Sequence, residues 1–433
     1  MLDRLLSEIN NLIYKLKQGI LQVFTANVLN KLIVMISNMV ITRVLTKPEY
    51  GTWGAVLNVY SYASLITGLG LVSGALQFGA ENRGNDKEYS FFKYCASVGL
   101  IINGIISIVF ILSTYIREYS IPEAVPYIRF FIPIILFEYI VEILLSMMRC
   151  DNKMSQYAKA LNINTVLIAL LTCLGAFWGV GGVVLGKYIA ALISTIYIMV
   201  INRNELNIIK IAQSISTVDK KELWHYSLFT GLSSCLNRVL YLLDVSMIAE
   251  LMTDAVEIAN YKVATMIPNS LSFIPSSVII VILPNIIANN KNYLWLKKNI
   301  KKTYTTLFLF NVCLGFFLVI LAPFIITIIS GKQYMDSVSP FRILVIGYVV
   351  AGTFRYFSTN LLAAFRRVIF NLIISVATGL ADIILNYYWI KSYGIIGAAY
   401  ATFSVEILAS IISFAFVLIE LRRRKALYFN NYD

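Results

Sequence analysis

The apolar segment from Ile20 to Thr42 constrains this chain most, because it is long enough to cross a bilayer yet carries a lysine near its middle. A helix of this length, rising about 1.5 Å per residue, spans the hydrocarbon layer. Lys31 lies roughly 16 Å of helix from either end, too far for its side chain to reach the membrane surface. We therefore expect its ammonium group to face a protein interior or a water-filled cavity.

The composition extends this conclusion to the whole chain. Of its 433 residues, 58% are hydrophobic and 14% are charged, whereas soluble domains have more charge and less apolar character. The apolar segments are long and continuous, which favours helices over the alternating strands of a barrel. We predict an all-α polytopic integral membrane protein with twelve transmembrane helices.

The net charge of +13 has a topological explanation. Most Lys and Arg residues fall in termini and short loops on one side of the predicted spans, which is typical of the cytoplasmic side. Both termini are therefore predicted to be cytoplasmic, and no nucleic-acid partner is expected.

No catalytic or metal-binding pattern is found. The five cysteines are scattered without paired spacing, and a single histidine cannot make a metal site with its neighbours. The chain has no phosphate-binding glycine loop with a lysine and no nucleophile elbow. We expect no cofactor, no metal and no catalytic residue, and hence no enzyme.

Two short patterns recur and indicate an internal duplication. Leu29-Asn30-Lys31 returns as Leu236-Asn237-Arg238, an offset of 237 − 30 = 207. Gly179-Val-Gly-Gly182 returns as Gly394-Ile-Ile-Gly397, an offset of 394 − 179 = 215. Six spans in each half would give both halves the same orientation, which predicts a parallel repeat about an axis along the membrane normal.

The predicted organisation follows from this repeat and from the polar connectors. Residues 1–18 place apolar and charged side chains on opposite helical faces, which favours an interfacial amphipathic helix. The predicted parts are the amphipathic helix 1–18, an N-terminal six-helix bundle 19–201, a cytoplasmic linker 202–222, a C-terminal six-helix bundle 223–421 and a cytoplasmic tail 422–433.

Ionisable residues inside the spans are the candidate functional groups, because each costs about 2.5 to 3.5 kcal/mol at a helix centre. The cations predicted to line a cavity and bind substrate are Lys31, Arg238, Arg355 and Lys187. Cations at the centre of both halves suit an anionic substrate, for which a diphosphate is the best candidate. The acids are interpreted either as proton-coupling groups or as structural ion-pair partners; they are Glu138, Glu142, Asp244, Asp382 and Glu406.

Five motifs, distributed along the chain, resemble those of a known family. They are Arg43-Val-Leu-Thr-Lys-Pro-Glu-Tyr-Gly51, Gly68-Leu-Gly70, Ile258-Ala-Asn-Tyr261, Gly331-Lys-Gln-Tyr334 and Tyr393-Gly-Ile-Ile-Gly-Ala-Ala-Tyr400. With this order and spacing, the chain resembles the oligosaccharide repeat-unit flippases (Wzx type) of the multidrug/oligosaccharidyl-lipid/polysaccharide (MOP) exporter superfamily.

The resemblance implies a MATE-like fold, in which two six-helix bundles form a V around a central cavity. It implies transfer of an undecaprenyl-diphosphate-linked oligosaccharide across the bacterial inner membrane, for O-antigen or other polysaccharide and lipopolysaccharide synthesis. Membrane lipids, a polysaccharide polymerase and the chain-length machinery are the implied partners.

Three alternatives remain open from the sequence. A lipid-linked peptidoglycan precursor is a related substrate. A cation-coupled multidrug antiporter of the same fold would line its lumen with acids, which Lys31 and Arg238 disfavour. A polytopic sugar polymerase or ligase would lack the repeat and would need a large outer loop.

Overall fold

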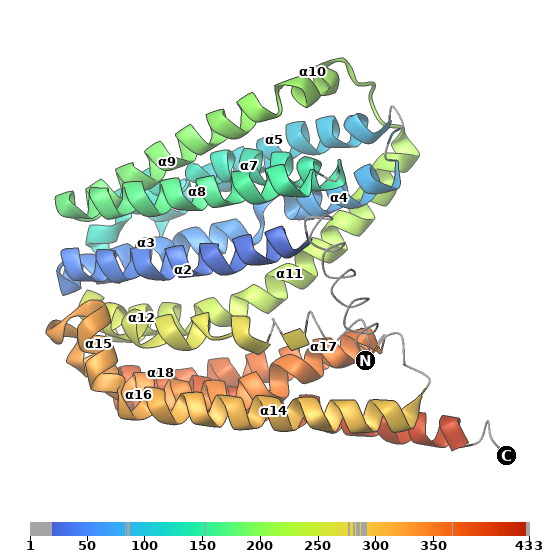
Figure 1. Cartoon of the computed structure of the whole chain (residues 1–433). Helices are drawn as coiled ribbons and strands as arrows, with labels where there is room; N and C mark the ends of the chain where they lie inside the picture. The colour runs from blue at the N-terminus through green and yellow to red at the C-terminus, as the bar shows by residue number, and fades with distance from the viewer. Residues whose placement is uncertain are drawn as a thin grey trace, which may run out of the picture. The chain divides into compact units, whose positions relative to one another are not determined.

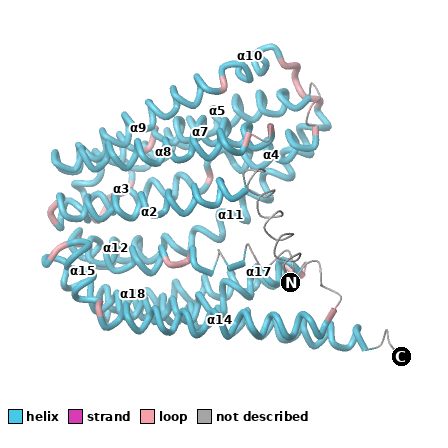
Figure 2. Tube along the Cα trace, viewed as in Figure 1, coloured by secondary structure: helices cyan, strands magenta, loops and turns pink. Residues whose placement is uncertain are grey.

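A computed structural model describes residues 20–429 except 83, 85–86, 152, 276–277, 280–281, 283–285, 287–291 and 366. The predicted amphipathic helix 1–18 therefore lies outside the described residues. Helices account for almost all of the described chain, joined by short loops, and no strand is present in it (Figure 2). The predicted all-α fold is confirmed.

The chain divides into two compact units, Met1–Leu242 and Leu243–Asp433. The elements up to this division (Figure 1) are α2 Ile20–Val44, α3 Lys47–Leu65, η1 Thr67–Gly70, α4 Leu71–Glu81, α5 Lys87–Ile116, η2 Pro122–Ala124, α6 Val125–Phe131, α7 Ile134–Cys150, α8 Met154–Gly175, η3 Ala176–Trp178, α9 Gly179–Ile201, α10 Arg203–Ile211 and α11 Thr217–Met252. The elements after it are α12 Ala255–Ser270, α14 Tyr293–Ile320, α15 Ala322–Ser330, η4 Lys332–Ser337, α16 Val338–Val350, the π-helical turn η5 Ala351–Arg355, α17 Tyr356–Ala364 and α18 Val368–Phe429.

The division falls within α11, beyond the linker predicted at 202–222. The first part of α11 packs closely on unit 1, which is why it groups there. A Cβ built on Gly70 would lie 2.1 Å from the backbone oxygen of Ser227. Trp224 also donates its indole N–H to the hydroxyl of Tyr94. The bundle boundaries drawn from the sequence remain a prediction.

Six helical segments among the described residues are long and apolar enough to cross a membrane, or seven when the bent pair Pro122–Phe131 and Ile134–Cys150 is one span. Two of the six each cover two predicted spans: Met154–Ile201 covers those at about 157–177 and 179–201, and Ile369–Ala426 covers those at about 368–390 and 393–421. Helices α2, α11 and α12 lie at the three remaining predicted spans, about residues 20–42, 223–251 and 256–288, and α12 covers the first part of the last of these. The predicted span that follows the basic loop at 291–302 was expected to run to Ser330, but its helix α14 ends at Ile320 and a separate α15 runs to Ser330.

The repeated glycine motif forms the same tight hairpin in both units. Gly179 (φ 71°, ψ −161°) and Gly394 (φ 58°, ψ −138°) adopt a backbone conformation that L side chains rarely adopt. Three residues later the helices touch: a Cβ on Gly182 would lie 2.0 Å from the oxygen of Gly175, and one on Gly397 would lie 1.9 Å from the oxygen of Trp389. The sequence repeat therefore corresponds to a repeated structural element.

The span predicted at about residues 52–78 is broken near its centre by η1. Gly68, Leu69 and Gly70 all have positive φ, at 56°, 47° and 82°. Gly68 donates its N–H to the buried side chain of Asn103 at 2.9 Å, and a Cβ at Gly68 would meet the Tyr139 ring at 2.4 Å. Glycines within a span commonly allow close helix packing. Gly68 and Gly70 also give the left-handed turn that separates α3 from α4.

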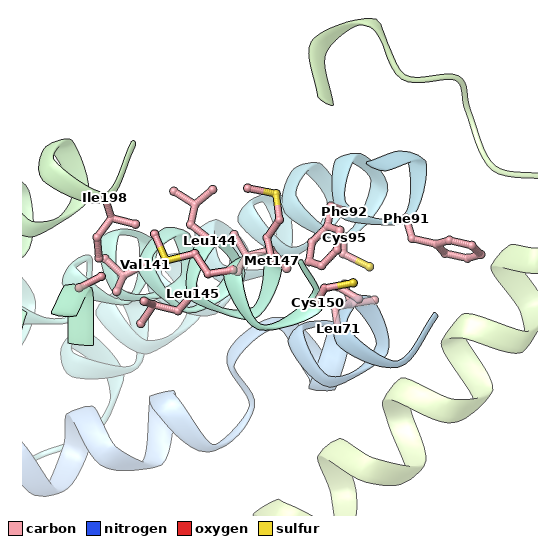
Figure 3. Close-up of a cluster of buried hydrophobic side chains, with 14 of the residues drawn as sticks. Leu71, Phe91, Phe92, Cys95, Val141, Leu144, Leu145, Met147, Cys150 and Ile198 are labelled. Atoms are coloured by element: carbon pink, nitrogen blue, oxygen red, sulfur yellow. The ribbon is translucent and has the colours of Figure 1, made fainter. Parts of the chain in front are cut away.

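Helix α7 separates an apolar core from a polar face in unit 1. Its buried side chains, including Val141, Leu144 and Met147, pack with residues of α4, α5 and α9 (Figure 3). The other face of α7 carries Glu138 and Glu142. Alternation at helical spacing thus positions the candidate site directly beside the core. A second cluster, including Phe357, Leu361 and Val417, forms part of the core of unit 2.

Candidate functional site: a polar cavity in unit 1

Unit 1 contains a cavity of about 490 Å³ lined by residues of α3, η1, α4, α7, α8 and the first part of α11. The broken span supplies part of the wall through Thr67 and Gly70. The predicted residues Glu138, Glu142 and Arg238 all line it. The structure therefore brings two of the candidate acids and one candidate cation into a single space.

Glu138 is held in place by two partners. Lys187 of α9 forms an ion pair with its Oε1 at 2.6 Å, and Tyr60 of α3 donates a short hydrogen bond to its Oε2. Lys187 is therefore placed as a counter-ion rather than as a free substrate cation. Of the two interpretations given to the acids, structural pairing is the one that this contact supports for Glu138.

Glu142 differs, although it lies one helical turn away on the same face of α7. Its side chain is exposed and lines the cavity. Among the described residues, no hydrogen bond or ion pair to this carboxylate is found within contact distance. The charges of Glu138 and Arg238 lie close enough to act on it. Glu142 is thus available to a ligand.

Arg238 and Lys31 were predicted to be the paired central cations. Arg238 is exposed and lines the cavity, and Lys31 is exposed on α2. Lys31 is not among the described residues that line this cavity. Its placement opposite Arg238 remains a prediction.

Arg149 also lines the cavity, although it is not among the site residues predicted from the sequence. It is in the last turn of α7, and its guanidinium lies 5.8 Å from the ring centroid of Tyr157, which also lines the cavity. The signal was present in the spacing: Glu138, Glu142, Ser146 and Arg149 fall on one helical face. Hydropathy alone favours another role for Arg149, because a basic residue at the end of a span is usually an interfacial anchor.

Unit 2 holds a second acidic cluster with a different construction. Both oxygens of Asp244 are hydrogen-bonded: Oδ1 accepts from Asn386 at 2.9 Å, and Oδ2 accepts from Tyr261 and Thr402, each at 2.7 Å. The same Asn386 amide donates to Asp382 at 3.0 Å. The two aspartates, predicted separately from different spans, are thus joined through one asparagine.

Arg355 and Glu406 complete the predicted set. They form an ion pair at 2.6 Å, with side-chain exposures of 15% and 13%, and their charges act on Asp382. Arg355 is therefore placed as the counter-ion of an acidic cluster in unit 2. In the part of the chain that the structure describes, no group of three or more His, Cys, Asp or Glu side chains is arranged to hold a metal ion.

Comparison with solved structures identifies the fold. An inward-facing multidrug resistance MATE family transporter of the MOP superfamily matches with a TM-score of 0.71 at 13% identity, over 92% of this chain and 96% of that chain. The lipid II flippase MurJ in an inward closed conformation matches with a TM-score of 0.74 at 16% identity, over 95% and 92%. A MOP superfamily transporter from Pyrococcus furiosus, described as having a binding pocket of reverse polarity, matches with a TM-score of 0.57 at 14% identity, over 94% of each chain.

These likenesses confirm the MATE-like fold that the motif resemblance implied. No curated protein sequence matches the chain significantly. The fold and the apolar helices make it a multi-pass membrane protein with the architecture of transporters and flippases. A family model described as polysaccharide biosynthesis protein matches residues 16–290, which is more than half of the sequence, and the chain therefore belongs to the polysaccharide biosynthesis protein family.

Proposed function

We propose that this protein is a flippase of the Wzx type, which moves an undecaprenyl-diphosphate-linked oligosaccharide repeat unit across the bacterial cytoplasmic membrane. Both termini would be cytoplasmic, and the product would enter O-antigen or another surface polysaccharide. The observation that carries the proposal is the cavity of unit 1, which holds Arg238 among hydroxyl groups, in a chain of the polysaccharide biosynthesis family with a transporter fold.

Arg238 and Lys31 are the proposed diphosphate-binding residues. Neither forms an ion pair with another residue in the described part of the chain, whereas Lys187 and Arg355 are each held by a glutamate. A guanidinium can engage phosphate oxygens with two parallel hydrogen bonds, while an ammonium acts as a point charge. Alternating access would expose these cations to each side of the membrane in turn.

Surface display of polysaccharide in a strain without its own flippase tests the proposal. The wild-type chain is expected to restore display. Arg238→Ala and Lys31→Ala should abolish it, Lys31→Arg should retain most of it, and Arg238→Lys should be intermediate because the bidentate contact is lost. Normal display by both alanine variants at wild-type abundance would show that these cations do not bind the substrate.

The alternative peptidoglycan substrate is separated by a second strain. A cell depleted of its lipid II flippase should not be rescued by this chain if the polysaccharide intermediate is its substrate. Rescue of that cell without restored polysaccharide display would replace the proposed substrate with the peptidoglycan precursor.

A further inference from the structure

The polar face of α7 follows the cavity wall for most of the helix. Glu138, Glu142, Ser146 and Arg149 all line the cavity and cover about 16 Å along the axis at 1.5 Å per residue. The face therefore changes from carboxylates near the middle of the span to a guanidinium in its last turn. This length exceeds what a diphosphate alone would occupy.

The charges of this wall are mixed. Glu142 faces the same space as Arg149 and Arg238, and Glu138 is already neutralised by Lys187. A phosphate placed along α7 would be repelled by Glu142, and an organic cation there would be repelled by the two arginines. A neutral ligand with both donors and acceptors avoids both penalties.

The remaining lining fits such a ligand. Ser64, Thr67 and Ser73 add hydroxyl groups, while Tyr157, Val72 and Leu161 add aromatic and apolar surface. Ligand pockets commonly combine apolar walls with a few placed polar groups, in volumes of about 300 to 1,000 Å³. The hydroxyl rim and the C–H faces of a pyranose ring match these two kinds of surface.

We propose, resting on the flippase function above, that the α7 face of this cavity binds a sugar of the lipid-linked oligosaccharide, namely a hexose or an N-acetylhexosamine. Glu142 accepts hydrogen bonds from sugar hydroxyl or acetamido N–H groups, and Arg149 donates to sugar oxygens towards the end of α7. Arg238, in the same cavity, holds the diphosphate to which the sugar is attached. Glu142 is then a specificity residue for the sugar and not a ligand of the diphosphate.

Binding to the purified full-length protein tests this assignment with two probes: undecaprenyl diphosphate, and the same lipid carrying N-acetylglucosamine. The wild type should bind the glycosylated lipid at least about tenfold more tightly than undecaprenyl diphosphate. This factor is typical of hydrogen bonds to a charged group. Glu142→Gln should remove most of this preference and change the affinity for the bare lipid less than about twofold. Arg238→Ala should lower the affinity for both probes.

Two further variants serve as a second test and as a control. Ser73→Phe fills the cavity from α4, where Ser73 is exposed, and should remove the preference without altering Glu142. Glu123→Gln neutralises an exposed carboxylate outside the cavity and should leave both affinities unchanged. Equal wild-type affinity for the two probes, or equal losses on both in Glu142→Gln and Ser73→Phe, overturns the sugar site.

The two proposals fail in different ways. If the chain restores polysaccharide display but binds both probes equally well, the flippase proposal stands and the sugar-site proposal is wrong. If the wild type prefers the glycosylated lipid, Glu142→Gln abolishes that preference, and the chain restores no display, the sugar-site proposal stands and the flippase proposal is wrong.

Discussion

Both units carry carboxylates within predicted membrane spans, yet the surroundings of these carboxylates differ. In unit 2, Asp244 accepts three hydrogen bonds from Asn386, Tyr261 and Thr402. In unit 1, Glu142 faces a cavity and finds no hydrogen-bond partner among the described residues. The first arrangement is a closed network, whereas the second is open to a ligand.

This difference shows that residue type alone does not define a site. A carboxylate whose oxygens are already hydrogen-bonded stabilises the helices that supply its donors, and its removal leaves those donors unsatisfied. A carboxylate beside open space contributes little to folding and has acceptor capacity to spare. Substitutions should therefore separate stability from transport in opposite ways in the two units.

The largest expected effect is the loss of stability in Asp244→Ala. Three polar side chains lose their charged acceptor, which should cost about 3 kcal/mol or more in unfolding free energy. Glu142→Ala should cost less than about 0.5 kcal/mol while reducing transport strongly. Thermal unfolding in detergent and polysaccharide display measure the two quantities. The comparison breaks if Asp244→Ala unfolds at the wild-type temperature or if Glu142→Ala is the less stable variant.

The two ion pairs should show the same contrast between the units, with losses no larger than that expected for Asp244→Ala. Arg355→Met leaves Glu406 without its counter-ion, and the Oε2 of Glu406 is buried with no hydrogen-bond partner among the described residues, so a loss of about 3 kcal/mol is expected. Lys187→Met should cost about half as much, since Glu138 retains Tyr60 and borders the cavity.

Double variants provide the control for these ion pairs. Arg355→Met with Glu406→Gln, and Lys187→Met with Glu138→Gln, should each recover most of the lost unfolding temperature, because the uncompensated charge is gone. Recovery in neither double variant would show that the losses come from packing and not from charge.

The glycine hairpins should respond alike, because they are the element that the two units share. Gly179→Ala and Gly394→Ala force a Cβ into a strained backbone region, and each should cost about 1 to 3 kcal/mol, as measured by thermal unfolding. Gly104→Ala is the matched control: Gly104 is helical, and nothing lies within 4 Å of a Cβ built there, so that variant should be neutral or slightly more stable. A loss confined to one hairpin would argue against structural equivalence of the repeat.

The smallest effect is expected just before the start of α8, outside the spans, where Lys153 pairs with Glu205 and Asp151. Burial raises the pKa of Glu205, but the hydrogen bond from Lys153, a backbone hydrogen bond and the charge of Lys153 together outweigh it and hold the pKa below its ordinary value. A lowered carboxyl pKa stabilises the fold above the unfolded-state pKa of about 4.3 and loses that contribution as the pH falls through the folded-state value.

Glu205→Gln should therefore lower the unfolding free energy at pH 7 by less than about 1 kcal/mol, because the pair is partly exposed. The unfolding temperature should fall slightly. The difference from wild type should shrink as the pH falls below about 4. Thermal unfolding across pH 3.5 to 7.5 measures it. A difference that stays constant over this range would assign the effect to packing.

The hairpin repeat could be predicted because its cause is local. The backbone conformation at Gly179 and Gly394 strongly favours glycine, so glycine recurs at the corresponding position of both halves. Part of the candidate site could be predicted: Glu138, Glu142 and Arg238 line the cavity, whereas the lining residue Arg149 was not among the predicted site residues. The break at Gly68 to Gly70 was also missed, because glycine in a span serves equally for close packing.

The sequence by itself determined the all-α membrane fold and the positions of the spans, since apolar length and positive-inside charge act residue by residue along the chain. Only the tertiary structure decided which charged residues pair and which stay open. Lys187 meets Glu138 from a different helix, and Asn386 joins Asp244 to Asp382 across distant segments. Partner choice depends on distances of a few ångströms between helices, and no local pattern in the sequence encodes those distances.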